Sequence, residues 1–379
     1  ILKDTDLVTG LVSSHANILV LSILAIMIVS LKNSLDVNTS LNIIKRFTYC
    51  VVLYFFVLFT VKDEDSLKML IKAALISMFV VGILGIVEAA SGTVLHAVPI
   101  FNWKSIFGAP LSRQVLAIEP NRIAGPFGDA EAHIIHSITF FFISMSLFIV
   151  VKRWSAKILL GLLILLLLAN IFGTAYKVGI FGFGVSYILF CGLAGFRHRG
   201  RVIIFSLFII VGTLGLLSIT VPQLNLERLI SMRGEAGEHA QLRVRNAAMA
   251  LKMFSDHPIL GNGPDGFIIR YPRFAKSYPN APRHVLTAHN QYFQILCEHG
   301  ILGLVLFLSL IGVVARNLVH IMRASSGFRR ELAVGVLAAL CAYVILWLGS
   351  SLLLDLRFWL LIAIAGILQK LSERDAISE

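Results

Sequence analysis

Long apolar stretches recur along the chain and limit the folds open to it. About ten of them, each of about 16 to 23 residues, match the length that a helix needs to cross about 30 Å of hydrocarbon. Each stretch is apolar throughout, whereas barrel strands alternate between two faces, so the pattern predicts membrane helices. The expected spans lie near residues 16–31, 47–61, 70–90, 133–151, 156–173, 178–195, 202–221, 300–317, 331–353 and 358–371.

The composition agrees with a bilayer as solvent. Hydrophobic residues make up 57% of the 379 residues and charged residues only 14%, which is too apolar for an ordinary soluble domain. We therefore expect an all-α fold, a polytopic transmembrane helical bundle with a long, partly helical periplasmic loop. The chain starts at Ile1 without the basic start of a signal peptide, so we expect earlier spans, for about twelve in the full chain.

The basic residues predict how the chain is oriented. Short loops rich in Lys and Arg stay in the cytoplasm, which applies to residues 152–153, 197–201 and 316–330. Counting spans from these loops places 91–132 and 222–299 on the outer side. Orientation and contact with anionic membrane lipids account for the net charge of +12, so no nucleic-acid partner is expected.

This count divides the chain into three parts. Residues 1–221 form the N-terminal membrane helices, 222–299 the long periplasmic loop, and 300–379 the C-terminal membrane helices with a cytoplasmic tail. The count also places 32–46 on the outer side. The four cysteines are scattered without close spacing, which predicts neither a disulfide framework nor a metal site.

The long outer loop is more basic than acidic, which fits either an anion site or a solvated loop near lipid headgroups. Residues 242–254 within it predict an amphipathic helix, which Asp256-His257-Pro258 ends, and a turn-rich segment follows at 261–266. Its expected apolar side carries Leu242, Ala247, Ala250, Leu251 and Phe254, with Arg243, Arg245 and Asn246 elsewhere.

A histidine stands where the long loop enters the next span. His289 is followed by Asn290 and, after Glu298, by an apolar run, so it is expected at the membrane surface. A neutral imidazole can accept a proton from a sugar hydroxyl. The alternative is a histidine that caps a helix. Asn290 and Glu298 either orient the histidine or satisfy helix-end amides and a loop contact.

The outer loop at 91–132 contains an arginine close to the next span. Arg122 at such a depth needs a partner, either a ligand phosphate or the carboxylates of Glu119 or Asp129. Lys177 lies at a tight outer turn between two spans and adds positive charge on the same face.

Three motifs together resemble the O-antigen ligase and O-antigen polymerase superfamily. They are Arg122-Ile-Ala-Gly-Pro-Phe-Gly-Asp129, then Arg243 ahead of a segment ending in Ile-Leu-Gly-Asn-Gly263, then Ala288-His-Asn with Glu298-x-Gly-Ile-Leu-Gly303. The resemblance extends from about residue 70 onward. The His-Asn segment that runs into the Glu-x-Gly span is its most specific part.

The resemblance implies a bacterial inner-membrane glycosyltransferase that uses no metal or other cofactor. Such enzymes take a glycan from undecaprenyl pyrophosphate on the periplasmic side. Carried over by residue, it makes His289 the candidate base or acceptor-positioning residue, and Arg122 and Arg243 candidate pyrophosphate ligands. Ala247 stands where the family often has Trp, so Arg245 competes with Arg243, and Lys177 stands where an Arg is common.

The expected function is that of an O-antigen ligase, which transfers the glycan to lipid A-core in lipopolysaccharide biosynthesis. A polymerase of O-antigen or exopolysaccharide repeats is the alternative, with the same donor and a lipid-linked glycan as acceptor. A lipid or glycan transporter is the alternative of another class. It predicts internal pseudo-symmetry and interrupted helices, and the sequence shows neither.

Overall fold

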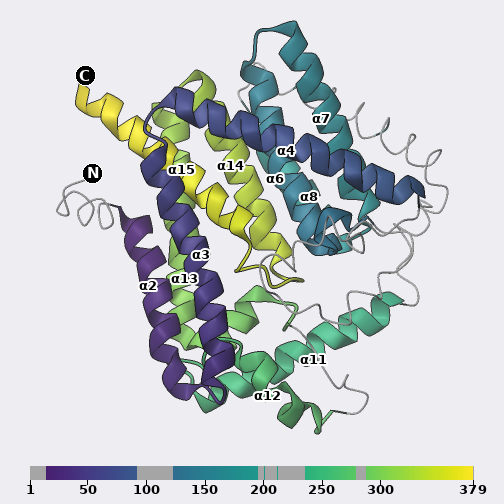
Figure 1. Ribbon diagram of the computed structural model, residues 1–379, viewed down its shortest axis with the longest axis vertical. Coiled ribbons are helices and arrows are strands. Elements are labelled where there is room, and N and C mark those ends of the chain that lie inside the picture. Colours follow the sequence, from purple (N-terminus) through teal and green to yellow (C-terminus); the bar gives the residue numbers. More distant parts are fainter. Residues whose placement is uncertain are drawn as a thin grey trace. The chain divides into compact units, whose positions relative to one another are not determined.

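The computed structural model describes residues 14–91, 123–194, 200, 211, 235–278 and 287–378. The regular elements within these residues are all helices, which confirms the expected fold class for this part of the chain. They are α2 (His15–Ser30), η1 (Leu31–Asn33), α3 (Val37–Thr60), α4 (Glu64–Ser91), η5 (Gly125–Phe127), α6 (Ala130–Val150), α7 (Trp154–Gly173), α8 (Lys177–Leu193), α11 (Glu235–Asp256), α12 (Gly266–Ala275), α13 (Gln291–Ala324), α14 (Gly327–Leu346) and α15 (Leu356–Ser378) (Figure 1).

Several helices have the length and composition of membrane spans, so this is a multi-pass membrane protein. In the described part of the chain, six qualify: α2 with its 3-10 extension, α3, α4, α6, α7 and α13. α8 is apolar but shorter. The span expected at 202–221 lies outside the described residues, apart from residue 211, and the total of about ten spans stays a prediction.

Several helix bounds differ from the expected spans, and the start of α3 and the end of α14 are two of them. α3 starts at Val37, well before the apolar run, because the Asp36 side chain caps it by accepting a hydrogen bond from Thr39 N at 3.1 Å. α14 ends at Leu346, so the span expected over 331–353 is wrong at its end. The apolar pattern continues there, but Gly349 and two serines follow in a segment of turns.

The chain forms two compact units. The first comprises Ile1–Lys62, Met232–His320 and Trp347–Glu379, and the second comprises Asp63–Ser231 and Ile321–Leu346. In the second unit, α14 packs against α6 and α8. In the first unit, α15 packs along α3, where the Phe47 and Trp359 rings meet edge to face at 5.2 Å.

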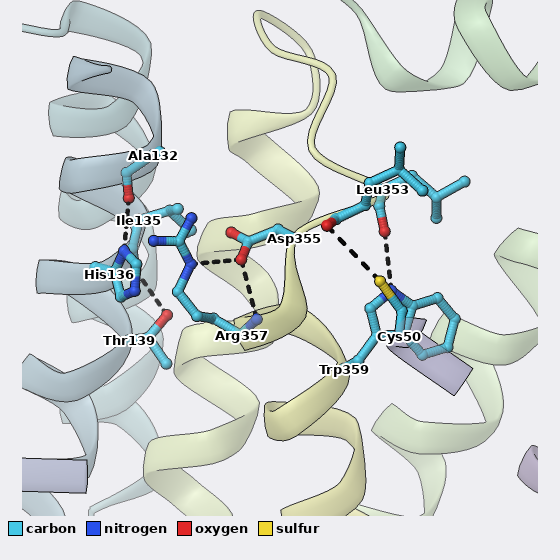
Figure 2. A network of polar contacts seen from close by, with 10 residues as sticks. Cys50, Ala132, Ile135, His136, Thr139, Leu353, Asp355, Arg357 and Trp359 are labelled. Atoms are coloured by element: carbon cyan, nitrogen blue, oxygen red, sulfur yellow. Dashed lines mark hydrogen bonds and ion pairs between the residues drawn. The ribbon is translucent and has the colours of Figure 1, made fainter. Parts of the chain in front are cut away.

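A short polar arrangement sets the start of α15 in the first unit (Figure 2). Asp355 is buried and accepts a hydrogen bond from Arg357 N at 3.0 Å, and the same two side chains form an ion pair. Trp359 Nε1 donates to Leu353 O at 2.9 Å. The segment before α15 is therefore tied to the helix that it enters.

Candidate functional site

The amphipathic helix expected at 242–254 lies within α11 and ends at Asp256 as expected. It runs crosswise to α2 and α3 of the same unit (Figure 1). Its buried positions are Asn246, Met249, Ala250 and Met253, which recur at the spacing of one helix face. Leu251 is 44% exposed, so the expected apolar side was wrong for Leu251 and for Asn246.

The reason is a second helix, α12, that sequence reading missed. Phe267, Tyr271 and Phe274 on α12 pack against the buried face of α11. The spacing of these aromatic residues indicates one helix face, but Pro272 inside the helix argues against a helix in the sequence. The resulting core consists of Met249, Ala250, Met253, Phe267, Tyr271, Phe274, Ala288 and Cys297.

A kink in α13 leaves backbone groups of this helix without their helical hydrogen-bond partners. Gly300 has φ 65° and ψ −167°, which interrupts the helix. The carbonyl oxygen of Cys297 accepts a hydrogen bond from Asn262 N, and that of Glu298 accepts one from Gly263 N, each at 2.9 Å. The turn-rich segment expected at 261–266 therefore supplies the partners that the kinked helix lacks.

Further contacts complete this arrangement, which we call the interlock and define as residues 258–263 with 297–301. Ile301 N donates to Pro258 O at 2.9 Å. The Asn262 side chain donates to Met253 O at 2.8 Å, which fixes the end of α11. Two motifs of the family resemblance thus form one structural unit.

The side chain of Glu298, on α13, contacts the start of α12. It is 6% exposed and accepts a hydrogen bond from Gln294 Nε2 at 3.1 Å. The backbone N–H groups of Asp265 and Phe267 also donate to its carboxylate. These contacts favour the expected alternative in which Glu298 satisfies helix-end amides.

The interlock is also tied to the loop between α2 and α3. Asn33 Nδ2 donates to Gly261 O at 2.8 Å, and Arg270 Nη2 donates to Asn33 O at 3.1 Å. Ser40 Oγ donates to Pro264 O at 2.6 Å. These bonds therefore place the loop between α2 and α3 beside the interlock and the start of α12.

His289 has a left-handed backbone, with φ 52°. Its N–H group donates to Thr287 Oγ1 at 3.3 Å. Asn290 caps α13, since its Oδ1 accepts from Phe293 N at 3.1 Å, and its Nδ2 donates to Leu348 O at 3.2 Å. Left-handed non-glycine residues are strained by about 1–3 kcal/mol and cluster at functional sites. The capping role therefore belongs to Asn290, and His289 is held in a costly conformation beside it.

Packing and hydrogen bonds fix the residues on both sides of His289. Ala288 is fully buried in the core between α11 and α12, and its N–H group donates to Gln294 Oε1 at 3.3 Å. Gln291 N donates to Trp347 O, and Gln291 Oε1 accepts from Leu353 N, each at 2.9 Å. The left-handed conformation of His289 is thus imposed by its surroundings.

Arg243 and Arg245 are half-buried on α11. At about 100° per residue, they lie on opposite sides of Asn246 around the helix, with Arg243 one turn before it. Burial raises the pKa of Tyr271, and the positive charge of Arg245 opposes that rise, so Arg245 lies near α12.

The second unit holds the segment that follows Arg122. Ile123 N donates to Gly173 O, at the end of α7, at 3.0 Å. Glu88 on α4 is buried and accepts hydrogen bonds from Ala124 N at 3.0 Å and Gly125 N at 2.5 Å. A buried carboxylate with two backbone donors is a strong anchor, so this segment is fixed on α4 and α7.

Arg122 itself lies outside the described residues, as does Glu119. Lys177 begins α8 after a three-residue turn, which confirms its expected place between two apolar helices. The bond from Ile123 to Gly173 brings the residue after Arg122 to the same turn. The first unit holds Arg243, Arg245, His289, Asn290 and Glu298, and the second holds Lys177.

Apolar helices of spanning length, joined to a folded polar segment in which His289 has a left-handed backbone, define a multi-pass membrane protein. Residues 161–308 match the family model described as O-Antigen ligase, which confirms the resemblance to the O-antigen ligase superfamily over that part of the chain. Members of this family are glycosyltransferase-like enzymes that act on lipid-linked glycans. No curated protein matches the chain.

Proposed function

We propose that the chain is an O-antigen ligase-type glycosyltransferase. It moves a glycan from undecaprenyl pyrophosphate to a hydroxyl group of lipid A-core, on the periplasmic side of the bacterial inner membrane, in lipopolysaccharide biosynthesis. The observation that carries this proposal is the strained backbone of His289, which lies within the segment that matches the family and is held from both sides.

The proposed reaction is a single inverting displacement. The oxygen of the acceptor hydroxyl attacks the anomeric carbon of the glycan, and the bond from that carbon to the pyrophosphate oxygen breaks. The electron pair leaves with undecaprenyl pyrophosphate, and the hydroxyl proton passes to the imidazole of His289. Because the donor already carries a good leaving group, positioning and charge stabilisation are the main requirements, and no metal or nucleotide sugar is needed.

In this proposal, Arg243 is the first choice as pyrophosphate ligand and Arg245 the competitor. Arg243 lies one turn from Asn246, toward the buried side of α11, whereas Arg245 lies on the other flank near Tyr271. The resemblance adds Arg122 as a further ligand, and Lys177 as a supporting cation. A guanidinium group binds a pyrophosphate oxygen pair with two parallel hydrogen bonds.

Substitution of Arg243 tests the ligand assignment. Arg243→Ala is expected to raise the Kd for undecaprenyl pyrophosphate about tenfold or more, since one charge-assisted pair is lost. Arg245→Ala is expected to have a smaller effect. Binding is measured with the purified full chain in lipid nanodiscs. The control is Lys252→Ala, which removes an exposed cation from α11, the same helix as Arg243; this cation lies over the Phe274 ring of α12. Equal losses in all three variants would show nonspecific charge attraction instead of a ligand site.

A polymerase of O-antigen or exopolysaccharide repeats remains the second candidate, because the resemblance covers both kinds of enzyme. Deleting the gene and separating the surface polysaccharide on a gel distinguishes them. Loss of a ligase leaves the lipid A-core without repeats and accumulates polymer on the lipid carrier. Loss of a polymerase leaves single repeats on the core. Unchanged polysaccharide would contradict both functions.

A further inference from the structure

Asn246 is a buried polar residue that the proposed reaction does not use. Its side chain is 0% exposed, and neither Nδ2 nor Oδ1 has a hydrogen-bond partner in the described part of the chain. The other residues of the same buried face, Met249, Ala250 and Met253, are apolar. A buried amide that has lost water without gaining partners costs stability, and such groups are rare in folded proteins. An apolar residue at this position would fit the fold better.

A second buried polar group lies on the facing helix. Tyr271 on α12 is 1% exposed, and its hydroxyl group has no hydrogen-bond partner within the described residues. The charge of Arg245, the residue before Asn246, acts on this hydroxyl. The packed helices α11 and α12 therefore carry two buried polar groups without hydrogen-bond partners among the described residues, and α11 also carries the two arginine residues that flank Asn246 around the helix.

We propose that Asn246 binds a hydroxyl group of the sugar that is attached to the donor pyrophosphate. The side-chain amide has both a donor and an acceptor to satisfy. Phosphate oxygens only accept hydrogen bonds, so a phosphate would leave Oδ1 without a partner. A sugar hydroxyl both donates and accepts, and it satisfies both atoms. This inference rests on the proposed function and places the first sugar of the donor beside the arginine residues of α11.

A purely structural role for Asn246 predicts the opposite effect on stability. Leucine is close to asparagine in shape and removes both unpaired polar atoms. If Asn246 binds a ligand, Asn246→Leu should raise the thermal unfolding midpoint of the protein measured without the lipid-linked glycan. The substitution removes two buried polar atoms that destabilise the unliganded fold. If Asn246 stabilises the fold, the same substitution should lower that midpoint.

The experiment compares two probe lipids bound to the purified full chain in nanodiscs. They are undecaprenyl pyrophosphate, and the same lipid carrying one N-acetylglucosamine. The natural sequence is expected to bind the glycosylated lipid about tenfold more tightly. Asn246→Leu is expected to lose that preference and keep the Kd for the bare lipid. Met249→Leu, one turn away on the same buried face, is the matched control and should keep both affinities.

The outcomes separate this inference from the proposed function. If Asn246→Leu keeps the preference for the glycosylated lipid, or lowers the thermal midpoint together with both affinities, the assignment to Asn246 is overturned. If the natural sequence binds both lipids equally, the inference fails and the proposed function stands. If it binds neither lipid, the proposed function is overturned and the inference with it.

Discussion

Replacing His289 with asparagine is expected to reduce glycan transfer about 100-fold to 10,000-fold while the protein stays folded, since this is the range of general acid–base catalysis. Asparagine tolerates a left-handed backbone, so the φ of 52° is retained. It offers an amide in place of the imidazole and accepts no proton at neutral pH. The loss therefore reports the chemistry of the imidazole and not a change of backbone.

The transfer reaction is measured with the purified protein, an undecaprenyl-pyrophosphate-linked glycan and lipid A-core, with the product separated on a gel. His257→Asn makes the same substitution after the end of α11 and is expected to keep full activity. The thermal midpoint and the Kd for undecaprenyl pyrophosphate should be unchanged in His289→Asn. Full transfer by His289→Asn would remove the proposed role. A lower midpoint with weaker lipid binding would assign His289 to the fold.

Replacing Gly300 with alanine is expected to lower the free energy of unfolding by about 3 kcal/mol or more. Its φ of 65° and ψ of −167° lie in a region that only glycine adopts readily. A Cβ atom there would lie 2.3 Å from Ile259 O, a backbone atom that belongs to the interlock. The interlock would have to open, which would release the Gly261–Gly263 turn and the end of α11 together.

Gly312→Ala is the control on the same helix. A Cβ atom at Gly312 meets nothing within 4 Å, so this substitution should keep or slightly raise stability. Thermal unfolding of the detergent-purified protein, followed by tryptophan fluorescence, measures both variants. If Gly300→Ala unfolds at the same temperature as Gly312→Ala, the interlock does not hold this part of the first unit together.

Residues of the same family motif differ in what they contact. The sequence predicts that Asn290 and Glu298 either orient His289 or satisfy helix-end amides. The contacts make Asn290 a helix cap, and they join the Glu298 side chain on α13 to the backbone at the start of α12. Gly300 is required by the kink. His289 differs from them in its left-handed backbone, which the residues on both sides of it hold in place.

The helix α11 could be predicted in part from the sequence. Its presence and its end at Asp256 could be predicted, because helix periodicity and a following proline are local signals. Its buried face could not be predicted, because that face is set by packing against α12. Pro272 inside α12 argues against a helix there in the sequence. The fully buried Asn246 was therefore expected on the wrong side of the helix.

The sequence by itself determined that this chain is a helical membrane protein. A helix that crosses hydrocarbon needs a continuous apolar stretch, and each such stretch is a local sequence pattern. It also indicated the family, through motifs that lie within residues 161–308 and before them. Only the tertiary structure decided which polar residues hold the fold together. Their partners come from distant segments, as when Gly263 N bonds Glu298 O and Asn33 bonds Gly261 O, and no local pattern encodes such contacts.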